Sequence, residues 1–445
     1  MSPPDSSGGA QDAAVPGFVS RDPATRESPL PAWLARIGSA RVHALAAEYG
    51  TPFYLYDADT VNSRIAAVRS AVDDRVKVFY AVKANPNLAL LRAVRGAVDG
   101  LDISSAGELE QALLAGFPAS ALSFAGPAKT DAELDMAIQK GVGCISAEST
   151  RELRSCIEIA KRRQLRANVG LRINPAFLNR AFGQKMGGKS IQFGIDEEHV
   201  DSAMEIVAAN AGHIVFHGVH VYAGSQCFEA DAVVESVKNT FRIVREMEQR
   251  TGAFCRSINL GGGFGVSHGE KDRELDLAAL SGALLPVLRE FRDGSRGERE
   301  IIFELGRFLT ATAGAYITRV VSSKESRGTM FFMVDGGLNH QLGAAGTFGA
   351  TLRANYPVRN LSRPDASKTL CSIAGPSCNP TDMLGINIEL PRPEHGDLIA
   401  VLKSGSYGYT ASPLMFLGRP TPAELVIHEG QVVLGRTPRG ITDFN

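Results

Sequence analysis

A repeated alternation of short apolar runs and longer amphipathic stretches is the feature that most constrains this chain. The repeat extends from Val76 to Arg307. Each apolar run ends in glycine, serine, asparagine or another polar residue, and the stretch that follows carries charges at helical spacing. We count eight runs, which are VKVFYAVKA (76–84), LDISSA (101–106), LSFAGPAK (122–129), CISAES (144–149), NVGLRIN (168–174), IVFHGVHVYAGS (214–225), SINLGGG (257–263) and IIFELGR (301–307).

The repeat predicts the α/β class. Continuously apolar strands separated by helices are typical of a parallel sheet that is covered on both faces. Eight units in a segment close to the roughly 250 residues of a TIM barrel favour a (β/α)8 barrel. A doubly wound open sheet is the alternative.

The last third of the chain lacks this rhythm. Segments such as SKTLCSIAGP and AELVIHEGQVVLGR are typical of β-strands without intervening helices. We therefore predict a C-terminal, mostly antiparallel β domain. The expected organisation is a flexible tail (1–30), a lead-in helix and strand that join the β domain (31–56), the barrel (57–310) and the β domain (311–445).

Composition excludes several classes of protein. Lys+Arg at 47 against Asp+Glu at 48 give a formal net charge of −1, so no overall basic field favours nucleic acid or membrane. The chain has no apolar run of about 18 residues and no secretory signal, so we expect a cytoplasmic protein. Its 6 cysteines have no CxxC spacing, which argues against a disulfide framework and a zinc site. We predict no metal.

Three features at predicted strand ends carry reactive chemistry. Lys83 ends an apolar run, where low dielectric would lower the pKa of the amine and favour imine formation, although a lysine there can simply extend to solvent. Gly261, Gly262 and Gly263 end the seventh run, and Gly306 and Arg307 end the eighth, which is where such barrels commonly bind phosphate. A glycine triplet alone can be a plain turn.

Glu304 lies two residues before Gly306 and therefore on the same face of its strand. Its carboxylate could be a salt-bridge partner or could keep a ring nitrogen protonated. An imine-forming lysine, a phosphate loop and such a carboxylate match the aldehyde, the phosphate and the ring nitrogen of pyridoxal phosphate.

With these residues the sequence resembles the fold-type III pyridoxal-phosphate decarboxylases, the group of diaminopimelate, ornithine and arginine decarboxylases, whose barrel is related to alanine racemase. The resemblance covers about residues 45–430. The matching segments are FYAVKANPN (79–87), GLDISSAGEL (100–109), GVHVYAGSQ (218–226), INLGGGFG (258–265), ELGRFL (304–309), GPSCNPTDML (375–384) and SGSYGYTAS (404–412).

The resemblance implies a role for each matching residue. Lys83 would bind the cofactor covalently, Glu304 would make its ring an electron sink, and Cys378 would protonate the substrate carbon from the other subunit of a homodimer with shared active sites. Taken alone, Cys378 would be read as a buried structural thiol. The implied cofactor contacts are Lys83, Asp102, Tyr222, Ser225, Gly261, Gly262, Gly263, Glu304, Gly306, Arg307 and Tyr407.

Three departures from the family pattern concern the substrate. Tyr222 stands where the family has a stacking histidine, and His220 lies two residues earlier. Asn379 replaces the acidic residue that binds a distal ammonium, for which Asp382 is a nearby substitute. The arginine that diaminopimelate decarboxylases use for the distal carboxylate is displaced to Arg353. We assign His220, Arg353, Asn379 and Asp382 as candidate substrate contacts.

The departures resemble a divergent branch of the family that is found with biosynthetic gene clusters, in which some members act on aminoacyl groups attached to carrier proteins. We therefore expect pyridoxal-phosphate-dependent α-decarboxylation of an amino acid with a non-basic side chain, or of a conjugated or carrier-bound group. The alternatives are meso-diaminopimelate decarboxylase, an amino-acid racemase and a non-catalytic pyridoxal-phosphate-binding protein. Racemases of this fold place arginine where this chain has Glu304, which favours decarboxylation.

Overall fold

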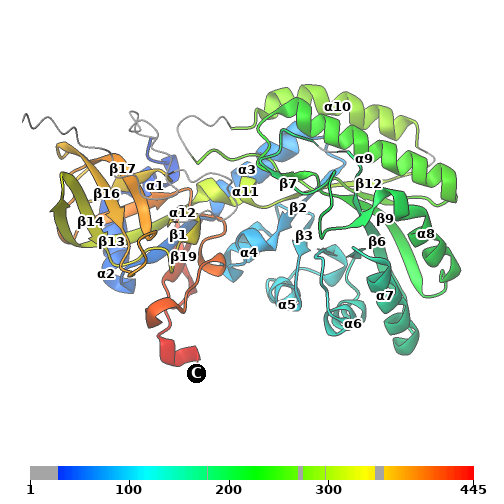
Figure 1. The fold of residues 1–445 in the computed structure, drawn as a ribbon, viewed down its shortest axis with the longest axis horizontal. Coiled ribbons are helices and arrows are strands. Elements are labelled where there is room, and N and C mark those ends of the chain that lie inside the picture. Colours follow the sequence, from blue (N-terminus) through cyan, green and yellow to red (C-terminus); the bar gives the residue numbers. More distant parts are fainter. Residues whose placement is uncertain (1–28, 178, 269–273, 296, 346–354, 445) are drawn as a thin grey trace, which may run out of the picture.

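The computed structural model describes residues 29–177, 179–268, 274–295, 297–345 and 355–444. Most of the predicted tail (1–30) lies outside these residues. Within them the chain forms an α/β barrel and a sheet-rich β domain, which lie side by side (Figure 1). No helix in the described ranges is long and apolar enough to cross a membrane.

The barrel consists of eight parallel strands that close on themselves. β12 pairs with β2, and β5 pairs with β6, so the sheet has no free edge. This closure confirms the barrel and excludes the open sheet. The strands are β2 (Val76–Ala81), β3 (Gly100–Ile103), β4 (Leu122–Phe124), β5 (Cys144–Ala147), β6 (Ala167–Asn174), β9 (Ile214–Val221), β11 (Ser257–Asn259) and β12 (Glu300–Leu305), with the short β8 (Ile195–Asp196) beside β6.

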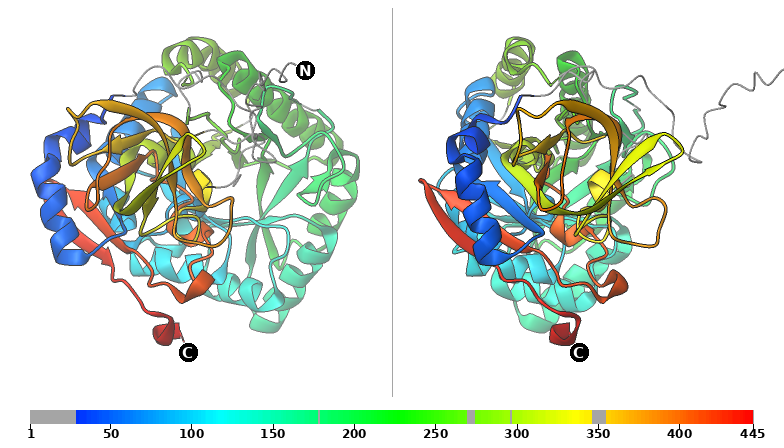
Figure 2. Two further views of the ribbon diagram at one scale, coloured as in Figure 1. Left: turned by 60° about the vertical axis from the view of Figure 1, so that its left-hand side comes forward. Right: turned by 90° about the vertical axis from the view of Figure 1, so that its left-hand side faces the viewer.

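Helices surround the strands (Figure 2). They are α3 (Ala58–Ala71), α4 (Leu88–Val94), α5 (Ala106–Leu114), α6 (Asp131–Lys140), α7 (Thr150–Arg163), α8 (Val200–Ala209), α9 (Ala230–Thr251) and α10 (Leu277–Asp293). α3 precedes the first barrel strand and packs between α10 and α4, which completes the ring.

Local sequence explains where these helices begin. Ser105 and Ser149 accept hydrogen bonds from backbone N–H groups in the first turns of α5 and α7, and Thr130 forms a capping box with Glu133 at the start of α6. Side-chain oxygens at these positions satisfy N–H groups that have no partner within the helix. α5 and α7 therefore begin three residues after β3 and β5 end, and α6 begins seven residues after β4 ends.

The β domain is a mixed, mostly antiparallel sheet. Its strands are β1 (Phe53–Asp57), β13 (Gly314–Ser326), β14 (Thr329–Val334), β15 (Val358–Asn360), β16 (Lys368–Ala374), β17 (Met383–Pro391), β18 (Leu398–Leu402), β19 (Ala423–His428) and β20 (Gln431–Arg436). β1, from the N-terminal part of the chain, pairs antiparallel with β13 and parallel with β19.

The helices α1 (Ala32–Ile37) and α2 (Ser39–Tyr49) pack against this sheet. Trp33, Leu34 and Leu45 from these helices share an apolar cluster with Phe53 and Leu55 of β1. The pattern predicted this β-rich region, and the structure confirms its fold class.

Candidate functional site

The largest group of predicted site residues surrounds a cavity of about 490 Å³ at the carboxyl ends of the barrel strands. Catalytic residues of such barrels lie at this end. The cavity lining includes nine of the predicted cofactor residues, which are Lys83, Asp102, Tyr222, Ser225, Gly263, Glu304, Gly306, Arg307 and Tyr407. Gly261 and Gly262 lie in the same loop as Gly263 but do not line the cavity.

Lys83 lies in a short 3-10 turn, Val82–Ala84, directly after β2. Its Nζ is 2.6 Å from Oδ2 of Asp102 at the end of β3, and Asp102 is only 1% exposed. Burial lowers the pKa of the Lys83 ammonium, but the charge and hydrogen bond of Asp102 raise it by more, so the pKa lies above its ordinary value. The expectation of a lowered pKa is therefore wrong for the protein without ligand.

Glu304 is the second-last residue of β12; it lines the cavity and is buried. Asn259 donates a hydrogen bond to its Oε1, and Nε2 of His220 lies 3.3 Å from its Oε2. Burial, with a further contribution from the charge of Asp102, raises the pKa of Glu304 to about 8. Burial also lowers the pKa of His220 well below its usual value. At neutral pH Glu304 therefore holds a proton and His220 is a neutral imidazole.

The glycine loop between β11 and α10 brings the backbone close to two neighbouring strands. A Cβ atom at Gly262 would lie 2.0 Å from the carbonyl oxygen of Glu304. At Gly263 a Cβ would lie 2.0 Å from the carbonyl oxygen of Gly224, and the residue has a φ of +84°. Glycine is required at both positions, and the resulting flat loop leaves room for an anion beside its backbone.

The β domain contributes Tyr407, which lies in the segment between β18 and β19. Its backbone N–H donates a 2.8 Å hydrogen bond to the carbonyl oxygen of Ala84, next to Lys83. The guanidinium of Arg307 lies 4.6 Å from the centroid of the Tyr407 ring. Ser225 faces the same space, and its Oγ is 3.1 Å from Oε1 of Gln184. Cationic, hydroxyl and backbone groups thus gather at one end of the cavity.

These residues fit pyridoxal phosphate. The cavity has an amine at Lys83, a proton-bearing carboxyl at Glu304 and an anion-binding end at Ser225, Gly263 and Arg307. In addition, Oδ1 of Asp102 is buried without a hydrogen-bond partner in the described chain. Buried polar atoms are rarely left unpaired, so a ligand group at this position accounts for it.

Sequence reasoning missed a buried ion pair beside the cavity. Nη1 of Arg172 on β6 lies 2.7 Å from Oε1 of Glu148, and the two side chains are 8% and 2% exposed. Glu148 also accepts hydrogen bonds from the backbone N–H groups of Gly126 and Gly194. The sequence signal was a single arginine within the otherwise apolar run NVGLRIN. Arg172 also stacks over the ring of Phe193 at the cavity wall.

We expect Arg172→Met to destabilise the folded protein by about 3–5 kcal/mol, because it leaves the Glu148 carboxylate buried without its cation. Urea denaturation of the ligand-free protein measures this. The double variant Arg172→Met/Glu148→Gln removes both charges and should recover part of the loss. Equal stability of the single variant and the wild type would show that the ion pair is not important.

The candidate substrate residues are placed differently from one another. Asp382 is 2% exposed, and its carboxylate accepts hydrogen bonds from the backbone N–H groups of Leu338 and Ser377. It therefore stabilises its loop, which corrects the hypothesis that it substitutes for a substrate-binding acid. Asn379 accepts hydrogen bonds from Thr381 within the same loop.

The remaining predicted residues are Cys378, Arg353 and His220. Cys378 is exposed and does not line the cavity of its own chain. Arg353 lies outside the described residues. His220 lines the cavity next to Glu304, at its base.

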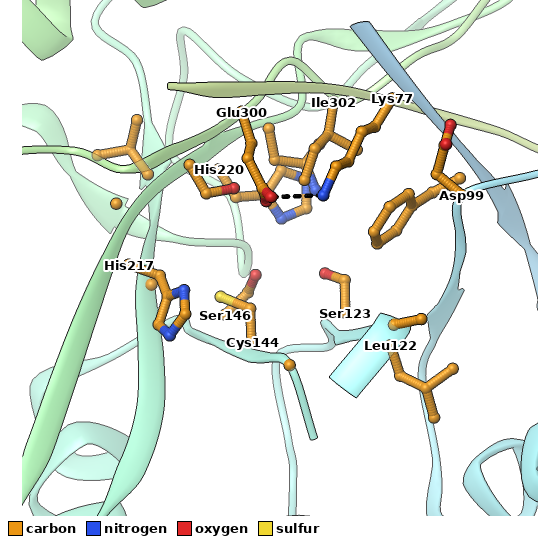
Figure 3. Close-up of a pocket in the computed structure, with 18 of the residues that line it drawn as sticks. Lys77, Asp99, Leu122, Ser123, Cys144, Ser146, His217, His220, Glu300 and Ile302 are labelled. Atoms are coloured by element: carbon orange, nitrogen blue, oxygen red, sulfur yellow. Dashed lines mark hydrogen bonds and ion pairs between the residues drawn. The ribbon is translucent and has the colours of Figure 1, made fainter. Parts of the chain in front are cut away.

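A second cavity, of about 290 Å³, lies at the opposite end of the barrel (Figure 3). Lys77 and Glu300 form an ion pair at its edge, and small side chains such as Ser123, Cys144 and Ser146 line it. His220 lines both cavities. The ring nitrogens of His220 have no hydrogen-bond partner among the described residues. Buried polar atoms are usually hydrogen-bonded, and the second cavity has room for a water molecule beside the ring.

Comparison with known proteins identifies the family of this chain. Residues 58–311 match the family described as "Pyridoxal-dependent decarboxylase, pyridoxal binding domain". The chain is 39% identical over 408 residues to an L-glutamyl-[BtrI acyl-carrier protein] decarboxylase of Niallia circulans, covering 90% of this chain and 94% of that protein. It is 31% identical over 409 residues to diaminopimelate decarboxylase of Bacillus subtilis, covering 89% and 91% of the two chains.

Solved structures give the same picture. Diaminopimelate decarboxylase from M. jannaschii, in complex with L-lysine, has a TM-score of 0.82 and 28% identity, covering 90% of this chain and 93% of the other. The enzyme from Helicobacter pylori, also in complex with L-lysine, has a TM-score of 0.80 and 27% identity, covering 90% of this chain and 98% of the other.

Proposed function

Because the chain belongs to the pyridoxal-dependent decarboxylases and is a pyridoxal-phosphate-dependent amino-acid decarboxylase, we propose a substrate for it: a glutamyl group carried as a thioester on an acyl-carrier protein. The observation that carries the proposal is the chemistry of the loop from Gly375 to Asp382. Its one carboxylate, Asp382, is buried against backbone N–H groups, so the loop presents no acid to a distal ammonium.

The chemistry of decarboxylation fixes how such a substrate is attached. Loss of carbon dioxide from Cα requires a free α-carboxylate, and reaction with the cofactor requires a free α-amino group. The thioester must therefore involve the side-chain carboxyl of glutamate. The distal end of the substrate is then an uncharged acyl group, which suits the neutral amide of Asn379 better than the ammonium of lysine or diaminopimelate would.

The names of two similar proteins bear on this choice. The carrier-linked glutamyl decarboxylase is 39% identical to this chain, whereas the diaminopimelate decarboxylase of Bacillus subtilis is 31% identical over a similar length. Diaminopimelate decarboxylation is the second candidate, because that activity is named for several similar proteins and for similar structures that hold L-lysine.

In the proposed mechanism the residues of this chain bind the cofactor, position its attachment to Lys83 and supply protons. When bound, pyridoxal phosphate supplies an electron-withdrawing ring that accepts the electron pair left at Cα when carbon dioxide departs. Lys83 supplies the amine that holds the cofactor, and Asp102 positions that amine. Glu304 holds a proton for the ring nitrogen. Ser225 and Arg307, with Gly263 and Tyr407, bind the phosphate.

Cys378 supplies the last proton in this proposal. Its S–H gives a proton to Cα, and the thiolate that forms recovers a proton from solvent. Because Cys378 does not line the cavity of its own chain, we propose that it reaches the cavity of a second copy. The active unit would then be a two-fold homodimer with residues of both chains at each site.

The shared site predicts subunit complementation. Lys83→Ala and Cys378→Ala homodimers should each be almost inactive, but mixing and reassociating them should restore about a quarter of the wild-type activity, because half of the dimers are mixed and each has one intact site. The measurement is decarboxylase activity against mixing ratio. A mixture no more active than its components would contradict the shared site.

Product analysis by mass spectrometry tests the substrate. The holoenzyme is offered, separately, the γ-glutamyl thioester of an acyl-carrier protein, free glutamate and meso-diaminopimelate. We expect the carrier-bound group to lose the mass of carbon dioxide while the free amino acids remain. Conversion of meso-diaminopimelate to lysine with no reaction of the thioester would overturn the proposal and establish the second candidate.

A further inference from the structure

We propose that three cations beside the cavity form a docking surface for an acidic carrier protein. They are Arg180, Lys185 and Lys189, which we call the rim cations, and they are the only charged residues in segment 179–194. This inference rests on the proposed function, because it names the surface that would receive the carrier.

The segment forms part of the cavity wall. Gln184, Met186 and Phe193 line the cavity, so the rim cations alternate with residues that face the reaction space. Within the segment, β7 (Gln184–Lys185) pairs antiparallel with β10 (Gly224–Ser225), which carries the predicted phosphate contact Ser225. A partner that touches these cations would therefore stand next to the opening.

The rim cations form no ion pair with a described residue, unlike several other surface cations of the barrel. Arg180 and Lys189 are exposed and Lys185 is half-buried, and no ion pair involves any of them among the described residues. By contrast, Arg163 pairs with Asp135 and Arg242 pairs with Glu197 on the outer helices. Unpaired charges of one sign create a field that attracts a partner of the opposite sign.

Hydrogen bonds from outside the segment or across its ends hold it in place. Asn174 donates to the carbonyl oxygen of Lys189 at 3.1 Å, and Asn179 donates to that of Ala232 on α9 at 2.8 Å. The backbone N–H of Gly194 donates to Glu148, and Ser225 contacts Gln184. A surface ordered in advance loses less conformational entropy when a partner binds.

The distribution of charge points to a macromolecule. A free amino acid is small enough to contact one of these cations at a time, whereas a folded acidic protein can contact all three. A substrate tethered to such a protein would be presented directly beside the opening, because the cations and the cavity wall share one segment. The partner that fits is therefore an acidic carrier with its acyl group directed into the cavity.

The test compares two forms of one substrate. The γ-glutamyl group is offered as a thioester of an acidic acyl-carrier protein and as a thioester of free pantetheine. The variant is Arg180→Glu/Lys185→Glu/Lys189→Glu. We expect its KM for the carrier form to rise about tenfold or more, with kcat within about twofold, and kcat/KM for the pantetheine form to stay within about twofold of wild type. Added salt should raise the wild-type KM for the carrier form and change that of the variant little.

A matched control reverses three exposed cations elsewhere on the helical ring. They are Lys140, Arg154 and Arg289, on α6, α7 and α10. The control variant Lys140→Glu/Arg154→Glu/Arg289→Glu carries the same change of net charge and should keep the wild-type KM for both forms.

The outcomes separate docking from function. An unchanged KM for the carrier form, or an equal loss on both forms, would overturn the docking surface. Wild-type enzyme that uses the pantetheine form as efficiently as the carrier form would overturn the docking surface while the glutamyl thioester chemistry stands. Wild-type enzyme that decarboxylates meso-diaminopimelate and neither thioester would overturn the proposed function, and the docking inference with it.

Discussion

Lys83→Ala should abolish decarboxylation, with a loss of turnover of about 10⁴-fold or more. Lys83 is the amine of the cavity, and its Nζ lies 2.6 Å from Asp102. Alanine removes the group that holds the cofactor, and no other residue of the cavity lining is a lysine. Reconstituted variant and wild type are compared by carbon dioxide release and by the absorbance of the bound cofactor, which should change together.

A control near the start of β2 separates chemistry from folding. Lys77 lies on β2, whereas Lys83 follows its end, so Lys77 is at the opposite end of the barrel, where it pairs with Glu300. Lys77→Ala should keep most of the activity, because a surface ion pair contributes only about 0–1 kcal/mol. Circular dichroism of both variants checks that the barrel forms. Substantial turnover by folded Lys83→Ala would disprove the assignment.

The fold could be predicted from the sequence because the barrel has a strong local signal. Each of the eight apolar runs contains one barrel strand, and the C-terminal segments without helical spacing form the β domain. Continuous apolar runs identify buried parallel strands before any tertiary contact is known. The site followed from the same logic, since strand ends of a closed barrel converge on one opening.

What could not be predicted depends on side chains that are distant in sequence. The raised pKa of Lys83 comes from Asp102, which is on the neighbouring strand, and burial alone would have given the opposite direction. The role of Asp382 depends on a loop that folds around its carboxylate, and sequence spacing carries no information on that geometry. Likewise, Arg172 and Glu148 meet across two strands.

Glu304→Gln should reduce kcat by about 10²–10⁴-fold while the cofactor stays bound, because an amide cannot supply a proton to the ring nitrogen. Gln keeps the size of the side chain, and its amide oxygen can still accept the hydrogen bond from Asn259, so packing changes little. Turnover and bound-cofactor absorbance are measured together. A variant with normal kcat would show that Glu304 does not set the protonation of the ring nitrogen during turnover.

The same substitution has a pH signature in the ligand-free protein. The folded pKa of Glu304 is raised from 4.5 to about 8, so the proton is bound more tightly in the folded state than in the unfolded state. The contribution of Glu304 to stability is therefore greatest at low pH and is lost as pH rises towards 8. The Glu304→Gln variant has no titrating group at this position. The free energy of unfolding of the variant, relative to that of wild type, should therefore increase between about pH 6 and about pH 8, as measured by urea denaturation.

The difference between the two proteins isolates this group, because most other titrating residues contribute equally to both curves and cancel. If the free energies of unfolding of variant and wild type change in parallel with pH over this range, Glu304 is already ionised in the ligand-free site. The carboxyl would then have no proton to give, and the large loss of kcat in Glu304→Gln would have to come from a lost charge. The two measurements together therefore distinguish a proton donor from a fixed counter-charge at the base of the cavity.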